Sequence, residues 1–153
     1  MQSPLAPSPK LLFLALFLAS GFVHAEGCTI DLKANDAMKF DQRAVTVSST
    51  CKTITINLVH TGKLPAQAMG HNVVIASADT YQAVAQDGMA AGLAANYVKA
   101  GDKRVIAATK IIGGGETTSA TFAGSTLKAG GAYKFFCTAP GHLALMTGQV
   151  TVK

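Results

Sequence analysis

The chain has 153 residues, a length typical of one domain, and its 13 Lys and Arg against 8 Asp and Glu give a formal net charge of +5. These basic residues form no stripe with interleaved aromatic side chains, so the charge does not indicate a nucleic-acid-binding protein. A chain of this length can bury a sizeable core without structural metals or many disulfides.

The first 25 residues have the pattern of a secretory signal peptide. Lys10 precedes the apolar run 11–19, and Val23-His24-Ala25 resembles a cleavage site that ends at Ala25. The mostly apolar stretch is about 13 residues long, whereas a membrane-spanning helix needs roughly 20. We therefore expect a signal peptide over residues 1–25, export of the protein, and one mature domain over residues 26–153.

Three cysteines remain after the expected cleavage: Cys28, Cys51 and Cys137. In an oxidising compartment Cys28 and Cys51, both near the mature N-terminus, are expected to form a disulfide. The loop that it closes is worth on the order of 3 kcal/mol in the loop-entropy model. Cys137 is left over, and an unpaired thiol in such a compartment needs burial or a metal.

Most of the mature chain is predicted to form short strands separated by turns. Residues 51–59 alternate, with Ile54, Ile56 and Leu58 on one face. Similar runs cover 117–122, 132–136 and 147–152, and a short buried run covers 72–76. Strands of this length and spacing predict an all-β fold, a Greek-key sandwich or barrel.

One stretch departs from the strand pattern. Residues 78–93 are rich in Ala, Gln and Met, with Tyr81, Val84 and Met89 at helical spacing. We expect a short helix inserted between strands here, with Asp79 as a candidate N-cap. We see no internal repeat and no second domain.

Metal-binding side chains gather in the segment between the last two predicted strands. Cys137, His142 and Met146 lie within ten residues, and Pro140-Gly141 permits a sharp loop that lets them converge. A second histidine, His71, follows Gly70 at the start of the buried run.

Two imidazoles and a thiolate in one plane, with a weak axial thioether, are the ligands of an electron-transfer copper. Thiolate and thioether favour Cu(I), and imidazole suits both Cu(I) and Cu(II). Zinc is the main alternative, but a structural zinc site would normally contain more cysteines and no methionine. We therefore predict one type 1 copper, bound by His71, Cys137 and His142 and weakly by Met146.

These residues strongly resemble the azurins, blue-copper proteins of the cupredoxin superfamily. The spacing Cys-x4-His-x3-Met of Cys137, His142 and Met146 is typical of azurins, whereas plastocyanin-like relatives have a shorter Cys-to-His gap. The likeness covers essentially all of residues 26–153 and includes the segments 69–72, 87–90, 104–107 and 135–138.

The resemblance implies a cupredoxin domain and further roles for individual residues. The Gly70 carbonyl would lie opposite Met146, and Asn72 would tie the two ligand loops together by hydrogen bonds. An apolar docking patch would surround the exposed edge of His142. Its members would be Met38, Leu64, Ala68, Met69, Ala139, Pro140, Gly141 and Leu145.

The implied function is electron transfer in the periplasm, without an enzymatic reaction. Transient partners would be redox proteins such as c-type cytochromes, nitrite reductase or amine dehydrogenases, and the protein would be a monomer. The chain departs from the best-known azurins in lacking Trp and in having Ala139 where a Phe is often found. His60 resembles the partly buried histidine behind the copper, and a purely structural role for it is an equal alternative.

Two other functions compete with this interpretation. A multicopper or nitrite-reductase-type enzyme needs a second copper site, and the expected mature chain has only His60 beyond the two predicted histidine ligands. A copper-trafficking or storage protein is the alternative that we retain. Such proteins favour exposed, labile sites that are often rich in Met or in paired Cys.

Overall fold

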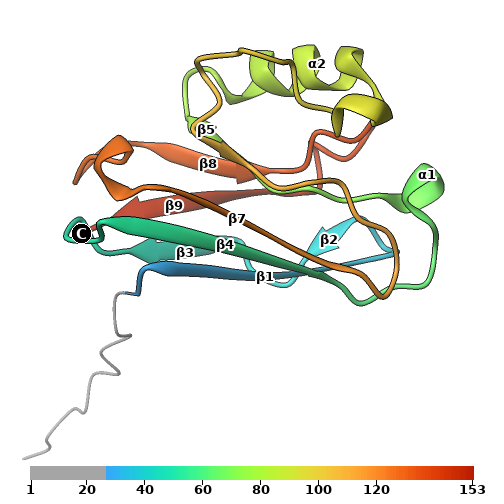
Figure 1. Cartoon of the computed structure of the whole chain (residues 1–153), viewed down its shortest axis with the longest axis horizontal. Helices are drawn as coiled ribbons and strands as arrows, with labels where there is room; N and C mark the ends of the chain where they lie inside the picture. The colour runs from blue at the N-terminus through green and yellow to red at the C-terminus, as the bar shows by residue number, and fades with distance from the viewer. Residues whose placement is uncertain (1–26) are drawn as a thin grey trace, which may run out of the picture.

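Two β-sheets pack face to face in this computed structural model, which describes residues 27–153 (Figure 1). The predicted signal peptide lies outside the described residues. The first sheet has the strand order β2 (Lys39–Phe40), β1 (Thr29–Asn35), β4 (Thr53–His60) and β7 (Thr117–Ala123). The second has the order β3 (Ala44–Val47), β9 (Thr147–Val152), β8 (Tyr133–Phe136), β5 (Val74–Ser77) and β6 (Ala107–Ala108).

The chain crosses repeatedly between the two sheets, so segments distant in sequence become neighbours. β1 pairs in parallel with β4, for example Ile30 with Ile56, and β3 pairs in parallel with β9. The other strand pairs are antiparallel, including β5 with β8 and β8 with β9. The predicted all-β Greek-key fold is confirmed, and of the two forms considered it is the sandwich.

The core between the sheets follows from the alternation of apolar and polar residues. In β4 the side chains of Ile54, Ile56 and Leu58 are fully buried, while Thr53 on the opposite face is exposed. β1 places Ile30, Leu32 and Ala34 in the same core in the same way. Each buried Ile or Leu contributes about 1.5–3 kcal/mol, so this alternation holds the two sheets together.

Residues 74–76 of β5 and 135–136 of β8 are apolar on both faces because both faces are covered. Ile75 and Phe135 point into the core between the sheets. Val74, Ala76 and Phe136 point the other way, against Val84 and Ala85 of the helix α2 (Tyr81–Ala91). Figure 1 shows α2 outside the sandwich, over β5 and β8. A strand covered on both sides has a continuous apolar sequence instead of an alternating one.

The predicted inserted helix is present, but its predicted cap is wrong. α2 begins at Tyr81 and its N-cap is Thr80, not Asp79, without a side-chain cap hydrogen bond. Thr80 instead hydrogen-bonds through its hydroxyl to Ser77, at 2.8 Å. A second helix, the single turn α1 (Ala66–Met69), was not predicted, since one turn has too few residues to show a periodicity.

The remaining structural features are two short turns and a disulfide. Short 3₁₀ turns cover Leu93–Ala95 and Gly124–Thr126. The predicted disulfide between Cys28 and Cys51 is confirmed, with Cα atoms 5.6 Å apart. Among the described residues, no helix is long and apolar enough to cross a membrane.

Candidate metal centre

Two segments meet at the same end of the sandwich. β5 begins beside the end of β8, where Val74 pairs with Phe136, so the residues just before β5 face those just after β8. His71 belongs to the first segment, and Cys137 and His142 to the second. The antiparallel pairing thus brings together side chains that are 66 and 71 residues apart in the sequence.

The three side chains form a compact, buried triangle of donor atoms. His71 Nδ1 lies 3.2 Å from His142 Nδ1, and Cys137 Sγ lies 3.5 Å and 4.0 Å from His142 Nδ1 and His71 Nδ1. A metal with bonds of about 2.0 Å to nitrogen and about 2.3 Å to sulfur, in one plane, needs donor atoms about 3.5 Å apart. The observed triangle therefore fits a metal ion.

His71 offers the metal-binding nitrogen because its other nitrogen is occupied. The ring Nε2–H donates to the carbonyl oxygen of Asn35, at 2.8 Å, which leaves the lone pair on Nδ1. Burial is the main reason that the pKa of His71 falls to about 4. The imidazole is therefore neutral at pH 7, as a metal ligand must be.

His142 and Cys137 share this apolar environment. Burial lowers the pKa of His142, so its imidazole is also neutral at pH 7. Burial raises the pKa of the Cys137 thiol to about 11. The thiol therefore keeps its proton while the site holds no metal, and a metal must displace that proton to bind sulfur.

Asn72 joins the two segments through hydrogen bonds. Its Oδ1 accepts from the Thr138 backbone N–H at 3.0 Å, and its Nδ2 donates to Thr138 Oγ1 and to the carbonyl oxygen of Asn96, both at 2.8 Å. Asn72 is fully buried, so these bonds form in a low-dielectric environment. Because Asn72 follows His71 and Thr138 follows Cys137, the bonds fix the spacing of two candidate ligands.

Met146 and Gly70 lie beside the triangle. Met146 is fully buried, its carbonyl oxygen accepts from the Cys137 N–H at 3.0 Å, and its N–H donates to the His142 carbonyl oxygen at 2.8 Å. Gly70 is buried immediately before His71. A Cβ on Gly70 would collide with the Ala66 carbonyl oxygen, so only glycine fits where α1 packs this closely.

The comparisons with known proteins agree with this donor set. The model of the copper-binding proteins of the plastocyanin/azurin family matches residues 26–153. The chain belongs to this family. An azurin of Pseudomonas denitrificans is 57% identical over 126 residues, which are 82% of this chain and 98% of that protein. An azurin of Alcaligenes faecalis is 55% identical over 123 residues, 80% of this chain and 96% of that protein.

A solved structure supports the same relationship. The azurin Az-iso2 from the obligate methylotroph Methylomonas sp. strain J is 41% identical to this chain, with a TM-score of 0.79. The match covers 82% of this chain and 98% of that chain. The family and the donor set together identify copper as the metal that the site binds.

His60 lies directly behind His71. The two rings stack with centroids 4.6 Å apart. His60 Nε2–H donates to the Met69 carbonyl oxygen at 2.9 Å, and its Nδ1 accepts from the Gly62 N–H at 3.0 Å. With both nitrogens bonded and no exposure, His60 holds the segment before Gly70 in place.

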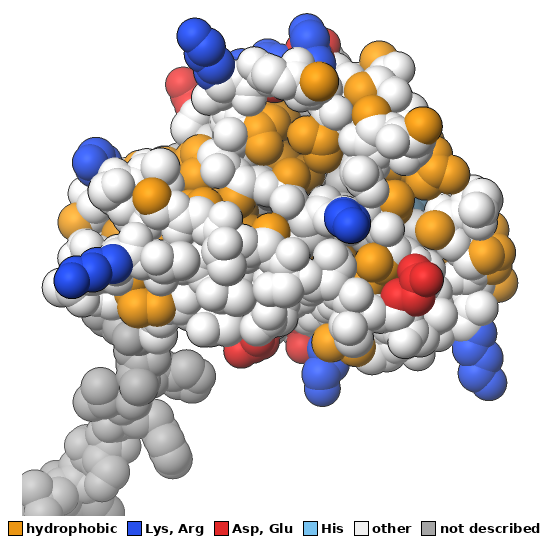
Figure 2. All heavy atoms as spheres, viewed as in Figure 1, with side chains coloured by type: hydrophobic (Ala, Val, Ile, Leu, Met, Phe, Trp, Pro, Cys, Tyr) orange, Lys and Arg blue, Asp and Glu red, His pale blue; other side chains and the backbone are white. Residues whose placement is uncertain are grey.

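The predicted docking patch is exposed only in part. Leu64, Ala68, Pro140, Gly141 and Leu145 are exposed, Met38 and Met69 are half-buried, and Ala139 is buried. His142 is only 5% exposed, but it lines a depression of about 120 Å³ together with Ala68, Pro140 and Tyr97. Figure 2 shows hydrophobic side chains towards the α1 end of the molecule and Lys and Arg scattered around the surface.

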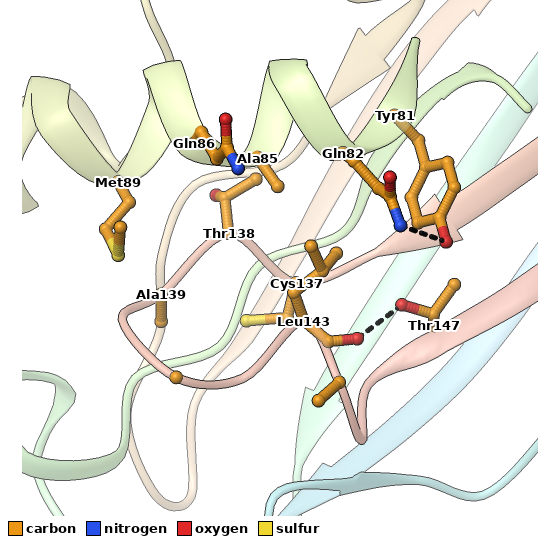
Figure 3. A pocket seen from close by; sticks show the side chains of 12 residues that line it. Tyr81, Gln82, Ala85, Gln86, Met89, Cys137, Thr138, Ala139, Leu143 and Thr147 are labelled. Atoms are coloured by element: carbon orange, nitrogen blue, oxygen red, sulfur yellow. Dashed lines mark hydrogen bonds between the residues drawn. The ribbon is translucent and has the colours of Figure 1, made fainter. Parts of the chain in front are cut away.

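A larger hollow lies between α2 and the segment after β8 (Figure 3). It has a volume of about 480 Å³ and is lined by Met89 and Ala85 of the helix and by Thr138, Ala139 and Leu143 of the segment. In Figure 2 hydrophobic side chains gather in the hollow below α2. Sequence reasoning did not predict this hollow, because it arises between segments that are distant in the chain.

Apart from Asn72, sequence reasoning missed the residues that support the segments carrying the candidate ligands. Thr109 Oγ1 accepts from the Val73 N–H at 2.9 Å, and Asn96 Oδ1 accepts from the Ile111 N–H at 3.0 Å. The partner of His71 is the backbone carbonyl of Asn35, which any residue type could supply. Only Asn96 carried a usable signal, because Asn tolerates the left-handed conformation that it adopts, with φ 55°.

Proposed function

We propose that the protein is a periplasmic electron carrier that cycles one type 1 copper between Cu(I) and Cu(II). The ligands would be His71 Nδ1, Cys137 Sγ and His142 Nδ1, with the Met146 sulfur and the Gly70 carbonyl oxygen as weak axial ligands. The observation that carries this proposal is the buried triangle of two imidazole nitrogens and one thiol sulfur.

The bound copper would supply a one-electron couple. The protein contributes a donor set that changes little between the two oxidation states. His71 is held by Asn35 and stacked on His60, and Asn72 ties the two segments together. Ligands fixed in this way by hydrogen bonds and packing need little rearrangement when the charge changes.

Electrons would enter and leave through His142. His142 lines the depression beside Ala68 and Pro140 and is slightly exposed, whereas His71 and Cys137 are fully buried. The exposed apolar residues around it would form a small contact that associates and separates quickly. Redox proteins such as c-type cytochromes, nitrite reductase or amine dehydrogenases would bind there transiently, with the carrier as a monomer.

Burial argues against copper trafficking or storage, the alternative function. His71 and Cys137 are fully buried, so an incoming chelating group has no direct access to them. Catalysis at a second copper also lacks support. Within residues 27–153, His71, Cys137 and His142 are the single group of at least three His, Cys, Asp or Glu side chains placed to hold a metal ion.

A redox titration of the copper-loaded protein, followed by absorption, tests the proposal. We expect reversible uptake of one electron per chain, and rapid electron exchange with a c-type cytochrome while copper stays bound. A trafficking protein would instead lose its copper to a soluble chelator on the timescale of that exchange. Irreversible reduction, or such rapid copper loss, would contradict an electron carrier.

A further inference from the structure

Gly88 lies in the interior of α2, where glycine is a poor choice. It is the eighth of the eleven residues of the helix Tyr81–Ala91 and is buried. A glycine inside a helix costs about 1 kcal/mol relative to alanine. Its backbone does not have a positive φ, so conformational freedom is not the reason for it. Glycine is therefore explained by the lack of room for a side chain beside the helix.

A Cβ on Gly88 would collide with the carbonyl oxygen of Tyr97 and would lie 3.4 Å from Thr138 Cβ. The helix backbone is thus seated directly against a turn at residues 96–97 and against the residue that follows Cys137. Figure 3 shows Thr138 beneath α2. Alanine at this position would force the helix and the turn apart by several tenths of an ångström, because the opposing atom is backbone.

The turn that Gly88 contacts is strained. Asn96 and Tyr97 both have positive φ, 55° and 52°, a conformation that L-residues rarely adopt and that is especially unusual for an aromatic residue. Such backbone persists only where its surroundings hold it in place. Here Asn96 Oδ1 accepts from the Ile111 N–H at 3.0 Å, and α2 covers the turn from outside.

This turn directs a carbonyl group at Asn72. The Asn96 carbonyl oxygen accepts from Asn72 Nδ2 at 2.8 Å, and Asn72 is the residue that binds the Thr138 backbone. A continuous path of contacts therefore runs from Gly88 through the turn to Asn72, and from Asn72 to the neighbours of His71 and Cys137.

Ion pairs hold the helix in this position. Asp87, next to Gly88, binds Arg104 at 2.5 Å and Lys99 at 3.2 Å, and Arg104 also binds Asp102 at 2.6 Å. These contacts tie the second half of α2 to the segment that follows the turn.

We infer that Gly88 is a positioning residue for the copper centre: the missing side chain lets α2 brace the Asn96–Tyr97 turn, which sets Asn72 and thereby the spacing of His71 and Cys137. This inference rests on the ligands named under the proposed function. It adds a role for a helix that supplies none of those ligands.

The test compares Gly88→Ala with a matched control in the same helix. Ala83 is exposed and does not line the hollow beside the metal segment, so Ala83→Gly weakens the helix without touching the turn. We expect Gly88→Ala to lower copper affinity by about tenfold, as losses of ligand-supporting contacts do, and to shift the sulfur-to-copper absorption. Ala83→Gly should reduce the stability to urea yet keep the wild-type spectrum and copper affinity.

A second variant reaches the same turn from the other side. Asn96→Ala removes the bond to Ile111 and disfavours positive φ, so it should also lower copper affinity. In the double variant with Gly88→Ala the two losses should combine to less than their product, because both act through one turn. If Gly88→Ala does not fold, the copper affinity of Asn96→Ala tests the inference by itself.

Two results would overturn the inference: a Gly88→Ala protein with the wild-type spectrum and affinity, whatever its stability, or an Asn96→Ala protein with unchanged affinity. Failure of the proposed function looks different, because the wild-type protein itself would then lack a sulfur-to-copper band.

Discussion

The three side chains that we propose as equatorial copper ligands differ in protonation before the metal binds. His71 and His142 are already neutral at pH 7 because burial lowers the pKa of each, that of His71 to about 4. Cys137 is still protonated at pH 7, because burial raises the pKa of its thiol to about 11. Metal binding must therefore remove a proton from sulfur alone.

We expect copper loading at pH 7 to release about one proton per ion, and copper affinity to rise about tenfold per pH unit through the neutral range. Below about pH 4 the affinity should fall more steeply with acid, because His71 then also binds a proton that must be removed. Calorimetry in buffers of different ionisation enthalpy measures the proton count. Cys137→Ser is the control and should release none; no release from the wild type would show that sulfur is not the displaced group.

A second prediction concerns the surface around His142. Leu145 is 49% exposed, and Leu145→Glu places a charge in the proposed apolar docking patch. Electron exchange with a c-type cytochrome should slow by at least about tenfold, since desolvating a carboxylate in a contact costs more than 1.4 kcal/mol. Stopped-flow absorption measures the rate.

Val59→Glu is the matched control for that prediction. Val59 is 37% exposed but lies on β4, outside the proposed patch. Val59→Glu introduces the same charge at a comparably exposed apolar position. Because this position lies outside the patch, the electron-exchange rate of the variant should stay near that of the wild type. Equal rates for Leu145→Glu and wild type would reject the docking surface.

The candidate ligands can be proposed from the sequence because their chemistry is rare. A Cys without a disulfide partner, close to a His and a Met, has few explanations other than a metal site. The spacing from Cys137 to Met146 then indicated which family the site resembles. Asn72 was expected to support the ligands, but two other supports are harder to predict. Asn35 acts through its backbone carbonyl, and Asn96 acts from a turn that packs against α2, distant from the ligands in the sequence.

At the scale of elements, α2 is attached through charged side chains as well as apolar ones. Arg104 bridges Asp87 of the helix and Asp102 of the following segment. Hydrogen bonding to Arg104 is the main reason that the pKa of Asp102 falls to about 2. Only 5% of the Asp102 side chain is exposed.

Acid should release this attachment. The ordinary pKa of Asp is 3.8, so the unfolded chain binds a proton at Asp102 before the folded chain does. The contribution of Asp102 to stability is therefore present above about pH 4 and is lost as the pH falls to about 2. Urea unfolding of wild type and Asp102→Asn from pH 5 to pH 2 should show a stability difference that shrinks with acid. A constant difference would mean that Asp102 does not titrate in this way.

The sequence predicted those elements whose residues show a clear period. β4 alternates and β9 lies where expected, at Thr147–Val152. β2 and β6 are two residues long, too short for a period, and form because neighbouring strands supply their hydrogen bonds. The cap of α2 was misplaced because Ser77, Asp79 and Thr80 are all suitable cap residues and tertiary packing decides between them.

At the scale of the molecule, the disulfide that stabilises the fold lies far from the metal centre. β1 runs from Thr29, next to the disulfide at Cys28, to Asn35, which binds His71 (Figure 1). The disulfide and the metal centre are therefore at opposite ends of this strand. The crosslink stabilises the fold mainly by limiting the unfolded chain, since it spans 23 residues.

Replacing both Cys28 and Cys51 with Ala should therefore lower the free energy of unfolding by about 3 kcal/mol. The visible spectrum of the copper-loaded double variant should match that of the wild type at temperatures where both are folded. Urea unfolding measures the first quantity and absorption the second. A shifted spectrum would mean that the far end of β1 influences the metal centre.

Copper ligation by Cys137 is tested most directly by the visible absorption and electron spin resonance of the wild-type protein loaded with oxidised copper, beside Cys137→Ser. We expect an intense blue sulfur-to-copper charge-transfer band and an unusually small copper hyperfine splitting in the wild type, and loss of both in the variant. A colourless wild type, or a variant as blue as the wild type, would contradict a copper–thiolate centre.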